Sequence, residues 1–94
     1  MNKFRFKLYV AGQTPRSQQA VTNLRQLCEE SLPGRYDMEV IDVLQHPDLA
    51  EDERILATPT LVKLSPTPIR RVIGDLSDFP KVRMGLELDT PGEE

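Results

Sequence analysis

Ala57-Thr58-Pro59-Thr60-Leu61-Val62 is the stretch that decides the fold of this 94-residue chain. It places a proline between two threonines at the start of an apolar segment, a pattern typical of a strand that begins at a sharp corner. Cis peptide bonds occur almost wholly before proline. Two alternatives therefore stand at Pro59: a cis corner, or an ordinary trans proline at the start of a strand.

The segments around this corner predict the second half of an α/β domain. Residues 40–44 are apolar except for Asp42 and predict a strand, and residues 47–55 predict a short acidic helix. Residues 60–64 and 69–73 predict two further strands, joined by the proline-rich loop 65–68. A strand, a helix, a Thr-Pro-Thr corner and a hairpin in this order indicate a thioredoxin-like fold.

The first half is regular. Residues 3–10 alternate between apolar and polar side chains, which predicts a strand with one face in the core. Thr14 is a suitable cap for a helix whose first residue is Pro15. We expect the strand at residues 36–44 to pair in parallel with the first, as in a βαβ unit. Its later half is apolar on both faces, which predicts a central strand covered by helices on both sides.

The last segment supports two secondary structures. Ser77 could cap a helix with Phe79, Val82 and Leu86 on one face. Val82, Met84, Leu86 and Leu88 also alternate strictly with polar residues and Gly85, which is the pattern of a strand. Gly85 weakens a helix by about 1 kcal/mol relative to Ala. Periodicity leaves both alternatives open, and residues 89–94 are expected to form a loose acidic tail on a single domain.

Composition excludes several classes of protein. The chain has 12 Lys and Arg against 15 Asp and Glu, whereas a general nucleic-acid binder needs a strongly basic face. No apolar run is long enough to cross a bilayer. One cysteine fits a reducing, cytoplasmic environment. Isolated basic clusters on an acidic chain indicate a specific acidic partner.

The sequence shows no catalytic constellation. A redox enzyme of thioredoxin class needs Cys-x-x-Cys after the first strand, but residues 11–14 read Ala-Gly-Gln-Thr. The single cysteine is Cys28, which we expect to be a buried residue of a helix. No nucleophile motif, metal-ligand spacing or phosphate loop is present. Asp42, in an apolar strand, must be paired or at a solvent edge. We therefore predict a protein that is not an enzyme and needs no metal or cofactor; a thioredoxin-like redox protein is a less favoured alternative.

Over residues 6–88 the chain resembles the KaiB family of circadian clock proteins. The matching segments, in order, are residues 7–12 (KLYVAG), 14–15 (TP), 40–44 (VIDVL), Pro47, 49–51 (LAE), 55–61 (ILATPTL), 70–71 (RR) and 73–77 (IGDLS). The resemblance implies a component that binds the N-terminal ring of the KaiC ATPase hexamer. It also implies capture of KaiA, which withdraws KaiA stimulation of KaiC phosphorylation, and engagement of a clock histidine kinase.

The resemblance further implies a metamorphic fold. The unbound form would be a homo-oligomer, a tetramer or a dimer, with βαββααβ order, and the binding form a thioredoxin-like βαβαββα monomer. Both forms share the first half of the chain. Val82 to Leu88, where periodicity is undecided, lie in the half that refolds.

Residue roles are implied by position in the family pattern. Partner contacts are expected at Lys7, Lys63, Arg70 and Arg71, and fold-switch positions at Pro59, Pro66, Pro68, Gly85 and Glu87. The chain departs from the clock members at the Pro66-Thr67-Pro68 loop, where those often have three prolines, and at Gln19, where they often have Arg. These departures favour, as an alternative, a KaiB-like paralogue that acts with KaiC in a stress or signalling role without KaiA.

Overall fold

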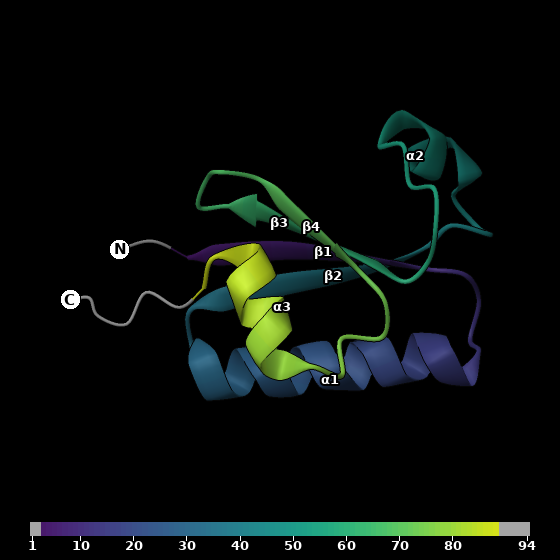
Figure 1. The fold of residues 1–94 in the computed structure, drawn as a ribbon. Coiled ribbons are helices and arrows are strands. Elements are labelled where there is room, and N and C mark those ends of the chain that lie inside the picture. The colour runs from purple at the N-terminus through teal and green to yellow at the C-terminus, as the bar shows by residue number, and fades with distance from the viewer. Residues whose placement is uncertain (1–2, 89–94) are drawn as a thin grey trace.

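A computed structural model describes residues 3–88. The predicted tail at residues 89–94 lies outside the described residues. The element order is βαβαββα, as a thioredoxin-like fold requires (Figure 1). The elements are β1 (Phe4–Val10), α1 (Pro15–Ser31), β2 (Tyr36–Asp42), α2 (Pro47–Asp52), β3 (Thr60–Ser65), β4 (Arg70–Ile73) and α3 (Phe79–Leu86).

The four strands form one sheet in the order β2-β1-β3-β4. β1 and β2 are parallel, as predicted, and the β1–β3 and β3–β4 pairs are antiparallel. The predicted central position of β2 is wrong, because β3 returns beside β1 and leaves β2 at the edge. The strand also ends at Asp42, so Leu44 belongs to the following turn. Val40 is 43% exposed, and the apolar run therefore marks an edge rather than burial on both faces.

α1 begins and ends where the sequence indicates. The Ser17 backbone N–H donates to Thr14 Oγ1 at 3.1 Å, and Pro15 occupies the first turn, where its missing N–H costs no hydrogen bond. The helix ends before Gly34, whose φ of +72° is unfavourable for other residues. The helical stripe that packs on the sheet is buried at Ala20, Leu24, Leu27 and Cys28.

The undecided segment near the C-terminus is a helix. α3 buries Val82 and Leu86, whereas Met84, which a strand pattern would place beside them, is 75% exposed. The cap is Asp78 rather than the expected Ser77, because the Lys81 backbone N–H donates to Asp78 Oδ1 at 3.2 Å. α2 is three residues shorter than predicted and ends at Asp52.

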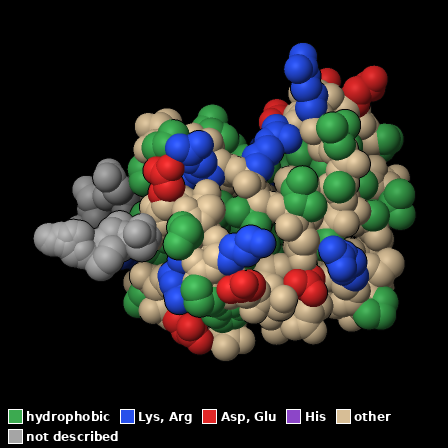
Figure 2. Space-filling model, in the orientation of Figure 1, with side chains coloured by type: hydrophobic (Ala, Val, Ile, Leu, Met, Phe, Trp, Pro, Cys, Tyr) green, Lys and Arg blue, Asp and Glu red, His purple; other side chains and the backbone are tan. Residues whose placement is uncertain are grey.

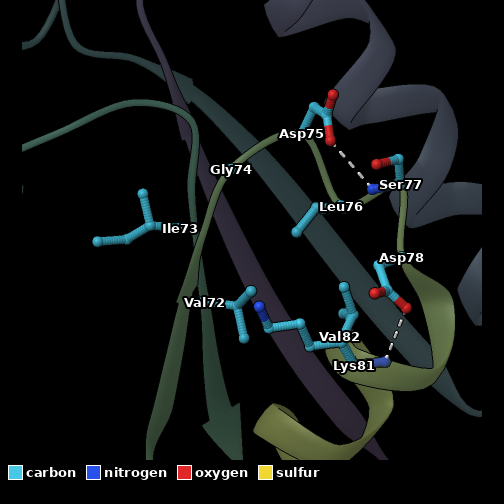
Figure 3. Close-up of a pocket in the computed structure, with 9 residues that line it drawn as sticks. All are labelled: Val72, Ile73, Gly74, Asp75, Leu76, Ser77, Asp78, Lys81 and Val82. Atoms are coloured by element: carbon cyan, nitrogen blue, oxygen red, sulfur yellow. Dashed lines mark hydrogen bonds between the residues drawn. The ribbon is translucent and has the colours of Figure 1, made fainter.

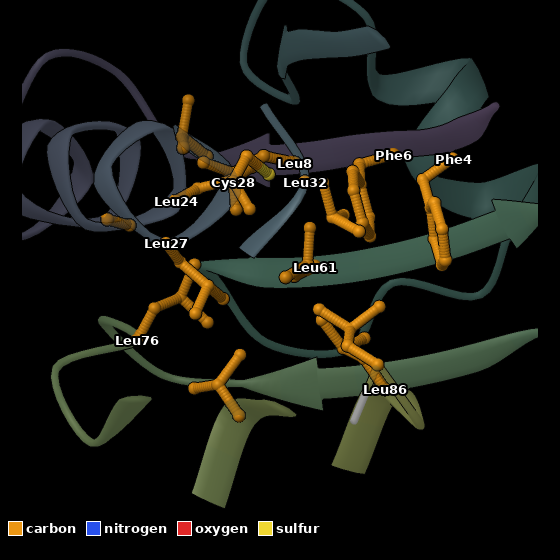
Figure 4. Packing of buried hydrophobic residues seen from close by; sticks show 14 residues of the cluster. Phe4, Phe6, Leu8, Leu24, Leu27, Cys28, Leu32, Leu61, Leu76 and Leu86 are labelled. Atoms are coloured by element: carbon orange, nitrogen blue, oxygen red, sulfur yellow. The ribbon is translucent and has the colours of Figure 1, made fainter. Parts of the chain in front are cut away.

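The sheet has two unequal faces. α1 and α3 cover one face, and α2 lies over one end of the other (Figure 1). The main core lies between the sheet and the helices α1 and α3, where Leu24 and Cys28 from α1 meet Leu8 and Leu61 from the strands (Figure 4). A smaller cluster of Tyr9, Ile41 and Val62 lies on the α2 face. The two faces are called the α1–α3 face and the α2 face below.

Candidate partner-binding surface

The turn between β1 and α1, where a thioredoxin carries its two cysteines, holds no thiol here. Gly12, at φ +74°, donates its backbone N–H to Asp42 Oδ1 at 3.0 Å. The Leu44 backbone N–H donates to the same oxygen at 2.9 Å. The expectation that Asp42 is paired or lies at a solvent edge is confirmed, because it accepts these two hydrogen bonds at the end of the edge strand β2. Its carboxylate fixes this turn against the end of β2.

Cys28 is buried on α1, as predicted. Burial raises the pKa of its thiol to about 12, and the neighbouring Glu29 carboxylate adds to the rise. A thiol with so high a pKa forms almost no thiolate near neutral pH, and the thiolate is the reactive species. Within residues 3–88, no group of His, Cys, Asp and Glu side chains is arranged to hold a metal ion.

The four predicted contact residues divide between the two faces of the sheet. Lys7 pairs with Val62, which pairs with Arg71, so this row lies on the α2 face. Lys63 pairs with Arg70, and Leu61, two residues before Lys63, belongs to the main core. Lys63 and Arg70 therefore lie on the α1–α3 face. The structure brings these cations together in two pairs, not in one surface.

Arg71 holds the segment after α2 against β4. Its guanidinium donates to the backbone carbonyl oxygens of Glu53, at 2.5 Å, and Arg54, at 3.2 Å. The Glu53 carboxylate lies 3.9 Å from the same guanidinium. Arg71 remains partly exposed, so it can support the loop and still present charge to a partner.

Arg70 connects β4 to the end of α3. Its Nε and Nη2 atoms lie 2.9 and 2.6 Å from Glu87 Oε2. Glu87 is the C-cap of α3 and adopts the left-handed conformation, with φ 59°. The pair places two of the predicted functional positions in direct contact.

The remaining predicted fold-switch positions also lie near the β3–β4 hairpin and α3. The bonds before Pro59, Pro66 and Pro68 are cis, which decides the alternatives at Pro59 in favour of the cis corner. A Cβ at Gly85 would lie 3.1 Å from Val72 Cγ2, so Gly85 marks a close approach of α3 to β4.

Two exposed apolar side chains on the α2 side were missed by the sequence analysis. Ile73 lies on the same face of β4 as Arg71 and is 66% exposed. Leu56, in the segment that Arg71 supports, is 94% exposed. The sequence offers a weak signal for Leu56, since an apolar residue follows the helix immediately before the Thr-Pro-Thr corner. We call Leu56, Arg71 and Ile73 the α2–β4 surface.

A shallow pocket of about 190 Å³ lies between the end of β4 and the start of α3 (Figure 3). The Ser77 backbone N–H donates to Asp75 Oδ1 at 3.1 Å, and hydrogen bonds from Ser77 lower the pKa of Asp75. Asp75 thus closes a turn. In the view of Figure 2, basic side chains lie singly among acidic and neutral ones. No described helix is long and apolar enough to span a membrane.

Comparison with solved structures supports the fold. The N-terminal domain of Synechococcus elongatus SasA superposes with a TM-score of 0.75 at 26% identity, covering 100% of this chain and 91% of that domain. Mitochondrial thioredoxin 3 from Saccharomyces cerevisiae superposes with a TM-score of 0.70 at 18% identity, covering 93% of this chain and 79% of the thioredoxin. The chain therefore has a thioredoxin-like fold.

Sequence comparison identifies the family. The circadian clock oscillator protein KaiB of Prochlorococcus marinus strain MIT 9312 is 57% identical over 82 residues, covering 87% of this chain and 78% of the relative. The circadian clock protein KaiB3 of a Synechocystis species is 46% identical over 92 residues, covering 98% and 90%. The model of the KaiB domain matches residues 7–88. The chain belongs to the KaiB family of circadian clock proteins, which are not enzymes.

Proposed function

We propose that this protein is a timing component that docks on the KaiC ATPase hexamer in the thioredoxin-like form described above. Docking would modulate the phosphorylation state of KaiC, in the family manner by sequestering KaiA. The observation that carries the proposal is a KaiB sequence on a thioredoxin-like fold whose active-site turn, at residues 11–14, has no thiol. A fold without reactive groups, with unpartnered apolar side chains at its surface, fits binding rather than catalysis.

We infer that the α2–β4 surface makes the principal contact with KaiC. Leu56 and Ile73 offer apolar area that no other described residue covers, and Arg71 adds a positive charge beside them. Lys7 lies on the same face of the sheet and could extend the contact. This combination fits a partner segment with apolar and acidic side chains, since Arg is favoured where carboxylates are recognised.

The test is co-elution of the protein with a cognate KaiC hexamer after hours at physiological temperature. Leu56→Asp should lower the affinity for KaiC by at least about tenfold. It places a negative charge at the centre of the contact, where we expect acidic side chains on the partner, and like charges repel. Met84→Asp is the matched control, because Met84 is also an exposed apolar residue but lies on α3. Wild-type protein that does not co-elute would contradict the function, and equal binding by both variants would contradict the surface.

The role of KaiA divides two versions of this function. The 46% identical relative is named KaiB3. The alternative that this protein is a paralogue, which acts with KaiC but without KaiA in a stress or signalling role, is therefore kept. Adding KaiA to the preformed complex distinguishes the two. A ternary complex supports KaiA sequestration, and a complex that never retains KaiA supports the KaiA-independent role.

The unbound form is proposed to be a cytoplasmic homo-oligomer, a tetramer or a dimer, of βαββααβ order. A clock histidine kinase is a further proposed partner, which the likeness to the SasA N-terminal domain supports. Sedimentation of the free protein and of its KaiC complex measures the change in oligomeric state. A monomer at all concentrations, with α3 helical, would contradict the oligomeric unbound form.

A further inference from the structure

Lys63 is a buried cation for which residues 3–88 supply no hydrogen-bond or ion-pair partner. It lies on β3 between Phe6 and Arg70 of the neighbouring strands, on the α1–α3 face. Its exposed fraction is 2%, the value of a core residue. Among residues 3–88 no acceptor forms a hydrogen bond or ion pair with its ammonium group. Lysine is almost never buried so fully unless it is paired.

The charges around Lys63 do not compensate it. Within the described part of the chain, the charged groups that act on it are Arg70 on β4 and Glu87 at the end of α3. Glu87 Oε2 already accepts two hydrogen bonds from the Arg70 guanidinium, at 2.9 and 2.6 Å. Lys63 and Arg70 therefore share the carboxylate of Glu87, and this carboxylate forms its ion pair with Arg70, the more exposed of the two cations.

Burial of an unpaired charge destabilises the arrangement that buries it. Burial also lowers the pKa of Lys63, Arg70 lowers it further, and Glu87 opposes the change. The residue thus costs free energy in this form, in contrast to the partner-contact role that its position in the family pattern implies.

We propose that the positive charge of Lys63 is a built-in bias against the thioredoxin-like arrangement, because that arrangement buries the charge between β3, β4 and the end of α3. The charge keeps the packing of α3 on the sheet weak enough to be released. This inference does not depend on KaiC binding, and its test uses the protein alone.

The primary test is amide hydrogen exchange of α3 in Lys63→Met, which keeps the side-chain volume and removes the charge. Exchange is read from the NMR signals of the thioredoxin-like form, which are distinct from the signals of the proposed unbound form. We expect exchange at residues 82–86 to slow by about tenfold, since replacing a poorly compensated buried charge by an apolar residue is often stabilising. Lys63→Arg retains a charge and should give no slowing. Lys7→Met removes a lysine from the α2 face and should leave α3 exchange unchanged.

A second measurement is the pH dependence of the urea midpoint. Below the lowered pKa of Lys63 both folded and unfolded chains carry the proton, so the wild type bears the full cost. Between that pKa and the ordinary value of about 10.4 the unfolded chain binds more protons, so wild-type stability rises with pH. The advantage of Lys63→Met should therefore shrink as pH is raised from 7 to 10.

Several results would overturn the proposal. They are α3 exchange in Lys63→Met that is unchanged or faster, failure of that variant to fold, equal slowing in Lys63→Arg, and an advantage that stays constant with pH. Each result would show that Lys63 stabilises the thioredoxin-like form, or that its charge does not change the stability of that form.

Discussion

At the scale of single residues, Glu87 combines a backbone cost with a side-chain gain. A left-handed conformation costs a non-glycine residue roughly 1 kcal/mol. Its ion pair with Arg70 joins two half-exposed groups, and such pairs contribute about 0–1 kcal/mol. The two effects are of similar size, so the end of α3 is held only weakly.

Two substitutions separate these effects. Glu87→Gln removes the ion pair and keeps the backbone cost, so it should lower the free energy of unfolding by about 0.5 kcal/mol. Glu87→Gly removes both and should be near neutral. Urea unfolding measures both, and Arg70→Gln provides the control background, in which Glu87→Gln should have a smaller effect that reports only the interaction of Glu87 with Lys63. A full effect in that background would contradict the pairing.

Cys28 allows a second prediction at this scale. Because burial raises the pKa of its thiol to about 12, the thiol should react slowly with a thiol-specific reagent at pH 8. The rate should rise by at least about 100-fold in denaturing urea, where the pKa returns to its ordinary value near 8.5. Rapid labelling of the folded protein would contradict the burial of Cys28. An insulin-reduction activity lost in Cys28→Ser would revive the redox alternative.

At the scale of elements, α3 is the segment whose secondary structure the sequence leaves undecided and the structure decides. Alternation at residues 82–88 favours a strand as much as a helix, and only the packing of Val82 and Leu86 on the sheet decides. Edge position is equally invisible in the pattern of β2, because an apolar edge strand and an apolar central strand have the same periodicity. β1, α1 and the β3–β4 hairpin could be predicted, since their caps, prolines and alternation are local signals.

Gly85 links helix propensity to the packing of α3 on β4. Ala at this position should favour the helix by about 1 kcal/mol, and hence the thioredoxin-like form. Its Cβ would also lie 3.1 Å from Val72 Cγ2, and Val has a stiff χ1. We expect Gly85→Ala to stabilise the thioredoxin-like form by much less than about 1 kcal/mol in the wild type, and by the full amount in a Val72→Ala background. Populations from amide NMR spectra test this, and an equal gain in both backgrounds would contradict the steric argument.

The candidate site could be predicted only in part. The sequence identifies Arg70, Arg71 and Lys63 through their positions in the family pattern, but only strand register places Lys63 on the α1–α3 face and Arg71 on the opposite face. Leu56 was missed because exposure of an apolar loop residue depends on how the loop packs. Register and loop packing arise from long-range contacts, and these leave no periodic signal.

At the scale of the whole molecule, the chain divides into a well-specified half and a weakly held half. β1, α1 and β2 contain the longest helix and the parallel pair. The second half contains the short α2, the hairpin, the buried Lys63, which has no partner among residues 3–88, and an α3 that ends on a left-handed residue. The proposed exchange between two arrangements of the second half would require such an asymmetry, since two interconverting forms can differ by only a few kcal/mol.

We propose that the thioredoxin-like form is the one that binds KaiC. The most direct measurement is the secondary structure of residues 79–88 in the complex, from NMR chemical shifts of the isotopically labelled chain bound to KaiC. We predict helical shifts at residues 79–86 and cross-strand contacts between Lys63 and Arg70 in the bound state. Strand shifts across residues 82–88 in the complex would contradict binding in the thioredoxin-like form.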